Sequence, residues 1–474
     1  MKNLSFLFCL FPLFLTAQSL KFNRTYGGAR YDDARSIVTC NDGNLLFTGL
    51  CKSAADSMGD MYLTKVNAAG AVLWTQYYGR TAEDGGNHVL PCADGGYLIT
   101  GHTAFSYGAD CDAYFVKTDA DGHELWRSFL GTSWDDVASQ SIEMPDGSFV
   151  TVGKTEDETT HSFRILLGRI SANGLKIMQK GLETAMPDIG ATMAIAADGN
   201  LLLAGFTYDP AQEKKDQMLV VKCTFDGTIL WRKQWPNALD ERVYSIQPNA
   251  DGGCFIVGGT ADEADQFVHM SAYRLDAQVN MMAAATELAE LGKGYLYAAT
   301  ALSNGNLVVA GMLQKRGAAY CQPFVAELDP DLKIVNSQTA ELSRACRTRA
   351  LTQTATGDFV LCGNLVDVPQ GDYGDIFLSK VNFKTSAVKD LAEETFVLFP
   401  NPFVTQTYIK AGKPGRPKTL RIYSPEGREM SVKHFDGDEY ILERGNLQQG
   451  SYFFDIEEDN SGNIKSGMLM IQDK

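Results

Sequence analysis

One ten-residue pattern recurs seven times along this chain of 474 residues. Each copy holds an Asp-Gly, Asn-Gly or Thr-Gly pair, an apolar stretch and a closing glycine, as in CNDGNLLFTG at residues 40–49. Successive closing glycines are 52 or 53 residues apart, and they are Gly49, Gly101, Gly153, Gly205, Gly258, Gly311 and Gly363. A period this strict is typical of one supersecondary unit that is copied along the chain.

Each unit contains four short segments with the composition of β-strands. In the first unit they are ARSIVTC, NLLFTG, DMYLTKV and a segment that ends at Trp74. The Asp-Gly and Asn-Gly pairs predict a two-residue hairpin turn in which both central residues have positive φ. Four strands repeated seven times predict an all-β fold, a seven-bladed β-propeller over residues 20–387.

The seventh unit lacks a convincing fourth strand, because the segment NFKTSAVKDLAEE follows its third strand. The missing strand is found at the other end of the repeat region, before the first unit. Residues 20–28 match residues 73–80 when shifted by 52 positions, which aligns Phe22 with Trp74 and Gly27 with Gly79. We therefore expect the N-terminal strand to complete the last blade, which removes the open sheet edges that a ring would otherwise leave.

The first residues, MKNLSFLFCLFPLFLTAQS, predict a secretory signal peptide over residues 1–17 that is cut after Ala17. Its apolar run is too short to span a membrane as a helix. No later segment approaches the length of a transmembrane helix, so no transmembrane segment is expected. The mature protein is therefore expected to be exported.

Composition excludes several classes of partner. The chain has 42 Lys and Arg against 58 Asp and Glu, a net charge of −16, which argues against a nucleic-acid partner. Nine cysteines remain after residue 17 and none forms a C-x-x-C pair, so the commonest zinc and redox spacings are missing. The sequence contains no phosphate-cradling glycine loop, and we expect neither a metal ion nor a cofactor.

The repeat stops after about residue 390, and residues 388–396 are expected to form a linker. Residues 397–474 contain short alternating strands that predict a small Ig-like β-sandwich. The segments LFPNPF at 398–403, LRIYSPEGRE at 420–429 and LQQGSYFFDIEE at 447–458 follow one another in this region. In this order they resemble the type A C-terminal sorting domain of the type IX secretion system.

In that resemblance Pro400, Asn401 and Pro402 match the opening motif, Gly427 the middle motif and Gly450 the late motif. It implies export through the periplasm by the type IX secretion machinery in a Gram-negative bacterium of the Bacteroidetes type. It also implies that the tail is removed and that the cargo is released or attached to the outer surface of the cell. The alternative for this region is a terminal Ig-like binding module.

The turn and the large residue before the end of each unit, NAAGAVLW and TDADGHELW, resemble the quinoprotein-type propeller repeat. The quinone enzymes of that family typically have eight blades and an adjacent cysteine pair. This chain has neither, so we interpret the resemblance as shared packing between blades.

Two sets of charged residues recur with the repeat. The acids Asp32, Asp84, Asp136, Asp188 and Glu241 enter the first strand of their units, and a basic residue recurs at Lys65, Lys117, Arg169, Lys222, Arg274 and Lys380. The acids could form a ring that binds a cation, or each could cap its own turn or bond to the next blade. We favour the second interpretation for the acids, and we also interpret the basic residues as structural.

Residues that break the repeat are the better candidates for function. The loops at one end of the predicted propeller vary, and they carry the aromatic residues Trp134, Tyr107, Tyr208, Phe267 and Tyr373. Aromatic residues beside Asp, Asn and Ser suit a glycan or a protein partner, although they could also be ordinary loop residues. The first hypothesis is therefore a non-catalytic, exported scaffold that binds a glycan or a protein through this face. The alternatives are a secreted glycan-active enzyme with acids near the central channel, and a structural or adhesion spacer.

Overall fold

The computed structural model describes most of the chain from residue 22 onward. The described residues are 22–28, 30–52, 59–79, 83–104, 110–184, 186–208, 216–235, 240–249, 251–261, 267–340, 342–366, 374–383, 397–399, 403–410, 417–424, 428–436, 439–458 and 464–473. The predicted signal peptide and the predicted linker lie outside them. Contacts divide the chain into two units, residues 1–387 and residues 388–474. No helix within the described residues is long and apolar enough to cross a membrane.

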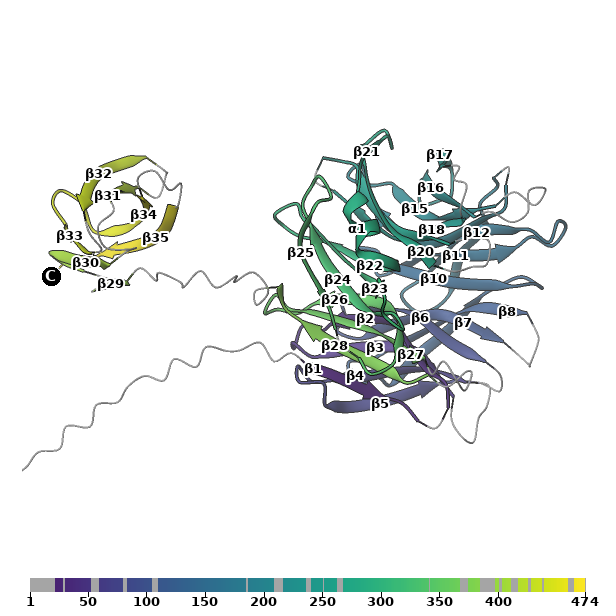
Figure 1. The fold of residues 1–474 in the computed structure, drawn as a ribbon. Coiled ribbons are helices and arrows are strands. Elements are labelled where there is room, and N and C mark those ends of the chain that lie inside the picture. The colour runs from purple at the N-terminus through teal and green to yellow at the C-terminus, as the bar shows by residue number, and fades with distance from the viewer. Residues whose placement is uncertain are drawn as a thin grey trace, which may run out of the picture. The chain divides into compact units, whose positions relative to one another are not determined.

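The N-terminal unit consists of repeated four-stranded antiparallel sheets with a propeller-like arrangement (Figure 1). The first sheet contains β2 (Asp32–Thr39), β3 (Leu45–Cys51), β4 (Asp60–Val66) and β5 (Val72–Tyr78). The second contains β6 (Asp84–Pro91), β7 (Tyr97–Ala104), β8 (Cys111–Thr118) and β9 (Glu124–Leu130). The third contains β10 (Asp136–Glu143), β11 (Phe149–Glu156), β12 (Phe163–Ile170) and β13 (Lys176–Gly181).

The later sheets repeat this order. The fourth contains β14 (Asp188–Ile195), β15 (Leu201–Thr207), β16 (Gln217–Cys223) and β17 (Ile229–Trp235). The fifth contains β18 (Asp240–Pro248), β19 (Cys254–Ala261), β20 (Phe267–Leu275) and β21 (Met281–Ala284). The sixth contains β22 (Gly292–Ala301), β23 (Leu307–Lys315), β24 (Gln322–Leu328) and β25 (Ile334–Thr339). The seventh contains β26 (Ala345–Gln353), β27 (Phe359–Val366), β28 (Ile376–Val381) and β1 (Phe22–Tyr26).

The first strands of these sheets form a closed series of contacts. In chain order β2, β6, β10, β14, β18, β22 and β26 each contact the next, and β26 contacts β2. Hydrophobic clusters lie between neighbouring sheets; one of them joins Phe47 and Tyr62 of the first sheet to Val360 and Leu378 of the seventh. The middle strands are buried on both faces, which explains why their sequences read as continuous apolar runs.

Strand β1 pairs with the edge of the seventh sheet. Phe22 lies opposite Lys380 of β28, in the same register as Trp74 opposite Lys65 in the first sheet. Trp74 packs on Gly122 in the turn of the following sheet, where an added Cβ would come within 2.8 Å of the indole ring. Phe22 packs in the same way near Gly70, so the large residue at this position is a packing residue between sheets.

A β-bulge interrupts the first strand of every one of these sheets. Each pairing of the first and second strand skips one residue, and the bulged residues are Arg35, Asn87, Ser139, Ala191, Tyr244, Tyr297 and Arg349. The closing glycine of each repeat lies 14 positions after the bulged residue. An added Cβ on any of these glycines would come within 1.8–2.1 Å of the carbonyl oxygen two residues before the bulge. Glycine therefore recurs because the bulged strand passes too close for a side chain.

The hairpin turns differ from the prediction of a two-residue turn. Only the turn glycine of each repeat has positive φ, between 76° and 87°, at Gly43, Gly95, Gly147, Gly199, Gly252, Gly305 and Gly357. In the first turn the main-chain N–H of Cys40 bonds to the carbonyl of Asn44, and the N–H of Gly43 bonds to Cys40. Asp42 accepts a bond from the N–H of Asn44 instead of adopting positive φ. Aspartate favours this longer turn because its side chain can bond to the main chain two residues ahead.

A short helix, α1 (Thr286–Leu291), follows the four-residue strand β21. The repeat did not predict it, although the segment TELAEL consists mainly of good helix formers. Leu288 is fully buried against the core between the fifth and sixth sheets, which holds this short helix in place.

The C-terminal unit contains two sheets. One has β29 (Val397–Phe399), β30 (Gln406–Lys410) and β33 (Glu439–Glu443); the other has β31 (Pro417–Tyr423), β32 (Glu429–Asp436), β34 (Gly450–Glu458) and β35 (Ile464–Ile471). Ile409 and Leu442 from the first sheet share one hydrophobic cluster with Leu420, Phe454 and Leu469 from the second. This unit therefore has a core of its own.

Replacing Gly205 with alanine tests the contact between the bulge and the glycine. The new Cβ would lie 2.0 Å from the carbonyl oxygen of Ile189, so the first strand must move. We expect the free energy of unfolding in urea to fall by about 3 kcal/mol. The control is Gly28→Ala, whose Cβ has no neighbour closer than 3.9 Å. Equal effects of the two substitutions would contradict this explanation.

Candidate functional site

The repeated acids are buried within their own sheets. Asp32 accepts a hydrogen bond from the N–H of Gly28 at 2.7 Å, and Asp188 is held by both nitrogens of one Arg232 fork at 2.7 and 2.8 Å. Glu241 accepts a bond from Tyr273 Oη at 2.6 Å. These partners belong to the local sheet or loop, so the acids are structural caps and not an open ring of ligands.

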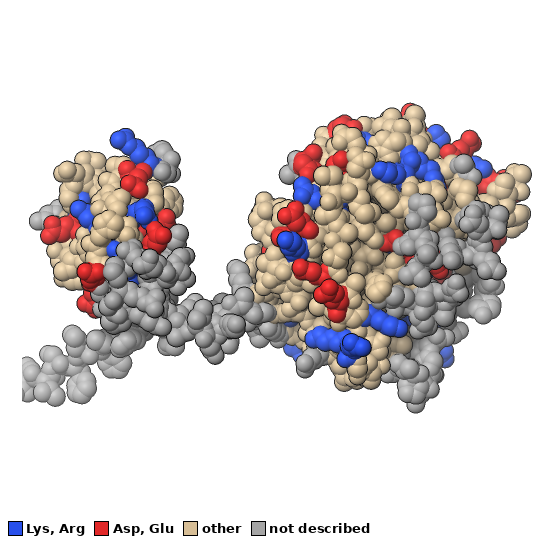
Figure 2. All heavy atoms as spheres, turned by 45° about the horizontal axis from the view of Figure 1, so that its top comes forward, with Lys and Arg blue, Asp and Glu red and all other residues tan. Residues whose placement is uncertain are grey.

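The repeated bases pair with the turn acids of their own sheets. The Nζ or Nη2 to carboxylate distances lie between 2.6 and 2.9 Å in the pairs Lys65–Asp42, Lys117–Asp94, Arg169–Asp146, Lys222–Asp198, Arg274–Asp251 and Lys380–Asp358. Acidic and basic side chains also lie interspersed on the face of the N-terminal unit seen in Figure 2. The repeated charges are therefore largely used to fix turns.

The bulged residues form the first candidate site, which we call the axial ring: Arg35, Asn87, Ser139, Ala191, Tyr244, Tyr297 and Arg349. All seven are partly buried. Five of them contact the next first strand around the ring. Arg35 Nη1 donates to Asn87 Oδ1 at 3.0 Å, and Asn87 Nδ2 donates to the carbonyl of Ala138 at 2.9 Å. Ser139 Oγ donates to the carbonyl of Gly190 at 3.1 Å.

The other side of the axial ring is aromatic and cationic. The rings of Tyr244 and Tyr297 are 4.9 Å apart, and the guanidinium of Arg349 lies 5.0 Å from the centre of the Tyr297 ring. Arg35 is paired with Asp33 at 3.0 Å, whereas no carboxylate of the described residues lies within ion-pair distance of Arg349. Burial raises the pKa of Tyr297 to about 12 in spite of the nearby arginines, so its hydroxyl stays protonated at neutral pH.

Two of the five predicted loop aromatics have described side chains. Trp134 is half-buried and meets the ring of His161 edge-on, with 4.3 Å between ring centres. His161 Nδ1 lies 3.1 Å from Glu156 Oε1. Burial raises the pKa of Tyr208, and the carboxylates of Asp216 and Glu156 raise it further. Glu156 therefore interacts with the neighbour of Trp134, His161, and also affects the ionisation of Tyr208.

The other three predicted aromatic residues lie partly or wholly outside the described part of the chain. Phe267 begins β20, but its side chain is not among the described ones. Tyr107 and Tyr373 lie outside the described residues. Among the residues matched to the sorting motifs, Pro400, Asn401, Pro402 and Gly427 also lie outside. Gly450 begins β34, opposite Ile471 of β35.

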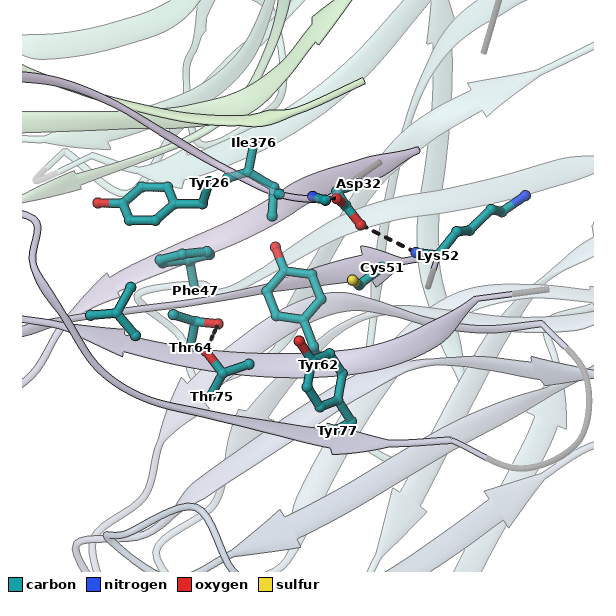
Figure 3. A pocket seen from close by; sticks show the side chains of 13 residues that line it. Tyr26, Asp32, Phe47, Cys51, Lys52, Tyr62, Thr64, Thr75, Tyr77 and Ile376 are labelled. Atoms are coloured by element: carbon teal, nitrogen blue, oxygen red, sulfur yellow. Dashed lines mark hydrogen bonds between the residues drawn. The ribbon is translucent and has the colours of Figure 1, made fainter. Parts of the chain in front are cut away.

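A second candidate site is a cavity of about 510 Å³ between the first sheet and β1, which we call the seam pocket (Figure 3). One wall is aromatic: the rings of Tyr26 and Phe47 are 5.5 Å apart, and those of Phe47 and Tyr62 are 5.9 Å apart. The other lining residues include Asp32, Cys51, Thr75 and Tyr77. A volume of this size suits a small ligand or one large side chain.

Sequence reasoning missed both the axial ring and the seam pocket. The axial ring could have been found, because its members share one repeat position and differ in residue type. The seam pocket depends on which side chain fills the space between two sheets, and the strand pattern does not contain that information.

The comparison with protein families decides the nature of the C-terminal unit. The family described as "Secretion system C-terminal sorting domain" matches residues 397–470. Residues 397–470 are a type IX secretion sorting domain. The sorting domain marks the chain as a protein exported to the cell surface or secreted, and it implies interaction with the type IX secretion machinery.

No curated protein matches the sequence. Solved structures with a similar backbone include PorZ, an essential surface component of the type IX secretion system of Porphyromonas gingivalis, with 13% identity, 92% of this chain covered and a TM-score of 0.44. A protein of unknown function from Dyadobacter fermentans has 12% identity over 76% of this chain and 99% of its own, with a TM-score of 0.46. A mutant of puromycin hydrolase has 13% identity over 90% of this chain, with a TM-score of 0.47. The chain spans 59% of the length of PorZ and 59% of that of the hydrolase, and likeness at this level concerns the fold alone.

The buried histidine beside the axial ring gives a prediction of pH dependence. Nδ1 of His88 is buried and has no hydrogen-bond partner among the described residues, and burial lowers the pKa of His88 to about 4. Between about pH 6.5 and pH 4 the unfolded chain binds the proton more readily than the folded chain, so the free energy of unfolding falls as the pH falls through this window. The total loss should be about 1–3 kcal/mol.

The His88→Gln variant should lose this dependence when urea unfolding is followed at several pH values. His123→Gln serves as the control, because His123 has an exposed side chain. An unchanged slope in His88→Gln would show that other groups cause the loss of stability.

Proposed function

We propose that this chain is an exported, non-catalytic binding protein. Residues 20–387 form a seven-bladed β-propeller whose last blade is closed by the N-terminal strand. Residues 388–396 link it to an Ig-like sorting domain at 397–474. The partner is a glycan or a protein, and it binds at the end of the propeller where the variable loops meet the first strands.

The observation that supports this proposal most is the composition of the axial ring. Seven equivalent positions carry five different residue types, whereas an acid recurs at the start of the first strand in five sheets and a base near the turn in six, and both sets are used in structural contacts. Tyr244, Tyr297 and Arg349 supply aromatic faces and a guanidinium without an ion-pair partner among the described residues. Such groups are common at binding hot spots. A rigid sheet scaffold holds them in place, which lowers the entropy that is lost on binding.

The carboxylates near Trp134 favour binding over glycan hydrolysis. Asp135 lies 3.6 Å from Lys154 and accepts a bond from the N–H of Cys111, while Glu156 is engaged by His161. A glycosidase requires two carboxyl groups that are free to face one sugar. A structural or adhesion spacer is the remaining alternative, and it requires no binding at the loops.

A glycan array tests the proposed site. We expect the purified mature chain to bind glycans of one class on the array. Trp134→Ala or Tyr297→Ala should weaken this binding at least tenfold, which is a loss of about 1.4 kcal/mol of binding free energy. Leu175→Ala is the control, because Leu175 is an exposed residue in a turn at the other end of its sheet. A blank array directs the search to a protein partner by pull-down from the cell surface. Binding that survives both substitutions would place the site elsewhere.

Removal of residues 397–474 tests the role of the sorting domain. In the source bacterium we expect the truncated chain to accumulate in the periplasm, whereas the full chain reaches the surface or the medium. Cell fractionation and immunoblotting measure this distribution. Met430→Ala, an exposed position on β32, is the control and should be exported normally. Export of the truncated chain would show that another segment carries the signal.

A further inference from the structure

The seam pocket has an occupied counterpart within the same chain. The register of the last two strands aligns the first sheet with the fourth, because Trp74 lies opposite Lys65 and Trp231 lies opposite Lys222. The next residue is Thr75 in the first sheet and Arg232 in the fourth. Thr75 and Arg232 therefore occupy equivalent positions, and the contacts of Arg232 indicate which groups surround an arginine at this position.

In the fourth sheet the guanidinium of Arg232 is held by three residues. It makes two hydrogen bonds to Asp188, at 2.7 and 2.8 Å, and one to Thr207 Oγ1 at 3.0 Å. Its Nη1 donates to Gln234 Oε1. Together these acceptors surround the planar group on several sides, which is the arrangement that arginine recognition requires.

The first sheet has a side chain that can accept a hydrogen bond at each position equivalent to a partner of Arg232. Asp188 lies opposite Thr207 in the fourth sheet, and Asp32 lies opposite Cys51 in the first. Tyr77 stands at the position of Gln234, three residues after the tryptophan. Asp32, Cys51 and Tyr77 all line the seam pocket (Figure 3). Thr75 is too short to fill it, and its hydroxyl bonds to Thr64 Oγ1 at 2.9 Å.

The pocket has the electrostatic character that a cation needs. Each oxygen of Asp32 accepts one main-chain N–H, from Gly28 at 2.7 Å and from Lys52 at 3.2 Å, and a carboxylate has about four acceptor sites. Burial, together with the nearby carboxylates of Asp32 and Asp60, raises the pKa of the Cys51 thiol to about 12. Lys52 also lines the pocket, but its side chain extends away from the aromatic wall in Figure 3, and its Nζ lies 3.9 Å from Glu83 Oε2.

The aromatic wall adds a second attraction. Tyr26, Phe47 and Tyr62 line the same pocket as Asp32 and Thr75, with neighbouring ring centres 5.5 and 5.9 Å apart. Arginine stacks on aromatic rings and gains more when the site is partly shielded from water.

We propose that the seam pocket binds a guanidinium group that is supplied by a ligand, which takes the place that Arg232 fills in the fourth sheet. The site is separate from the axial ring and does not rest on the function proposed for that ring. Its ligand is an arginine side chain on a partner or a free small guanidine.

Isothermal titration of the mature chain with agmatine and with N-acetyl-arginine N-methylamide tests this proposal. Both carry the guanidinium, and N-acetyl-citrulline N-methylamide is the neutral control. We expect saturable binding of at least one guanidinium compound, at least tenfold tighter than that of the citrulline compound. Binding of both compounds points to recognition of the guanidinium alone, and binding of the arginine amide alone points to an arginine within a protein.

Thr75→Arg is the decisive variant, because it should fill the pocket as Arg232 does in the fourth sheet. It should fold with an unchanged or higher melting temperature and lose the binding. Ser337→Arg is the matched control; Ser337 is the equivalent, exposed residue of the sixth sheet, and this variant should bind normally. Asp32→Asn should weaken binding at least tenfold where it folds. Equal affinity for the citrulline compound, no binding of either guanidine by folded protein, or undiminished binding by Thr75→Arg would overturn the proposal.

Discussion

The close approach of one carbonyl oxygen to one glycine organises the whole N-terminal unit. In every sheet the first strand bulges, and the carbonyl two residues earlier lies against the closing glycine of the second strand. The contact fixes where the first strand bends and therefore which residue is left out of the ladder. Because the geometry recurs in each sheet, seven side chains come to one level of the ring of first strands. Their chemical types are free to differ, since the strand pairing does not depend on them.

The repeated acidic and basic residues, unlike the residues of the axial ring, are constrained by their contacts. Each buried acid at the start of a first strand and each base near a turn is bound to a partner of its own sheet or loop, as Asp188 is to Arg232 and Lys65 is to Asp42. Leaving such a buried group without its partner costs several kcal/mol (about 3–5). This cost explains why, where the acid or the base is present, its partner is kept. The first sheet keeps the acid, Asp32, but has Thr75 at the position that Arg232 occupies in the fourth sheet.

Much of this architecture could be predicted from the sequence, because the period of 52 or 53 residues and the alternation of apolar segments carry it. The alignment of Phe22 with Trp74 corresponds to the register in which β1 meets β28. The bulges could not be predicted, since a single extra residue such as Arg35 hardly alters the apolar pattern. The turn geometry was predicted incorrectly, because an Asp-Gly pair suits both a two-residue turn and the longer turn at Asp42. Helix α1 depends on Leu288 packing into a tertiary core, which local patterning does not reveal. Among the candidate sites, Trp134 and Tyr208 could be selected by sequence, but the seam pocket required knowing which side chains share a space.

The pairing of β1 with β28 also bears on the order in which the chain acquires its structure. Phe22 and Lys380 are 358 residues apart in the sequence (380 − 22), so the chain must close a very long loop to form this contact. A chain that leaves the ribosome or crosses a membrane from its N-terminus exposes β1 as a solitary strand until nearly all of the unit has followed. The earliest segment of the unit is thus the last to find its neighbour, and until β28 has formed its edge has no strand to pair with.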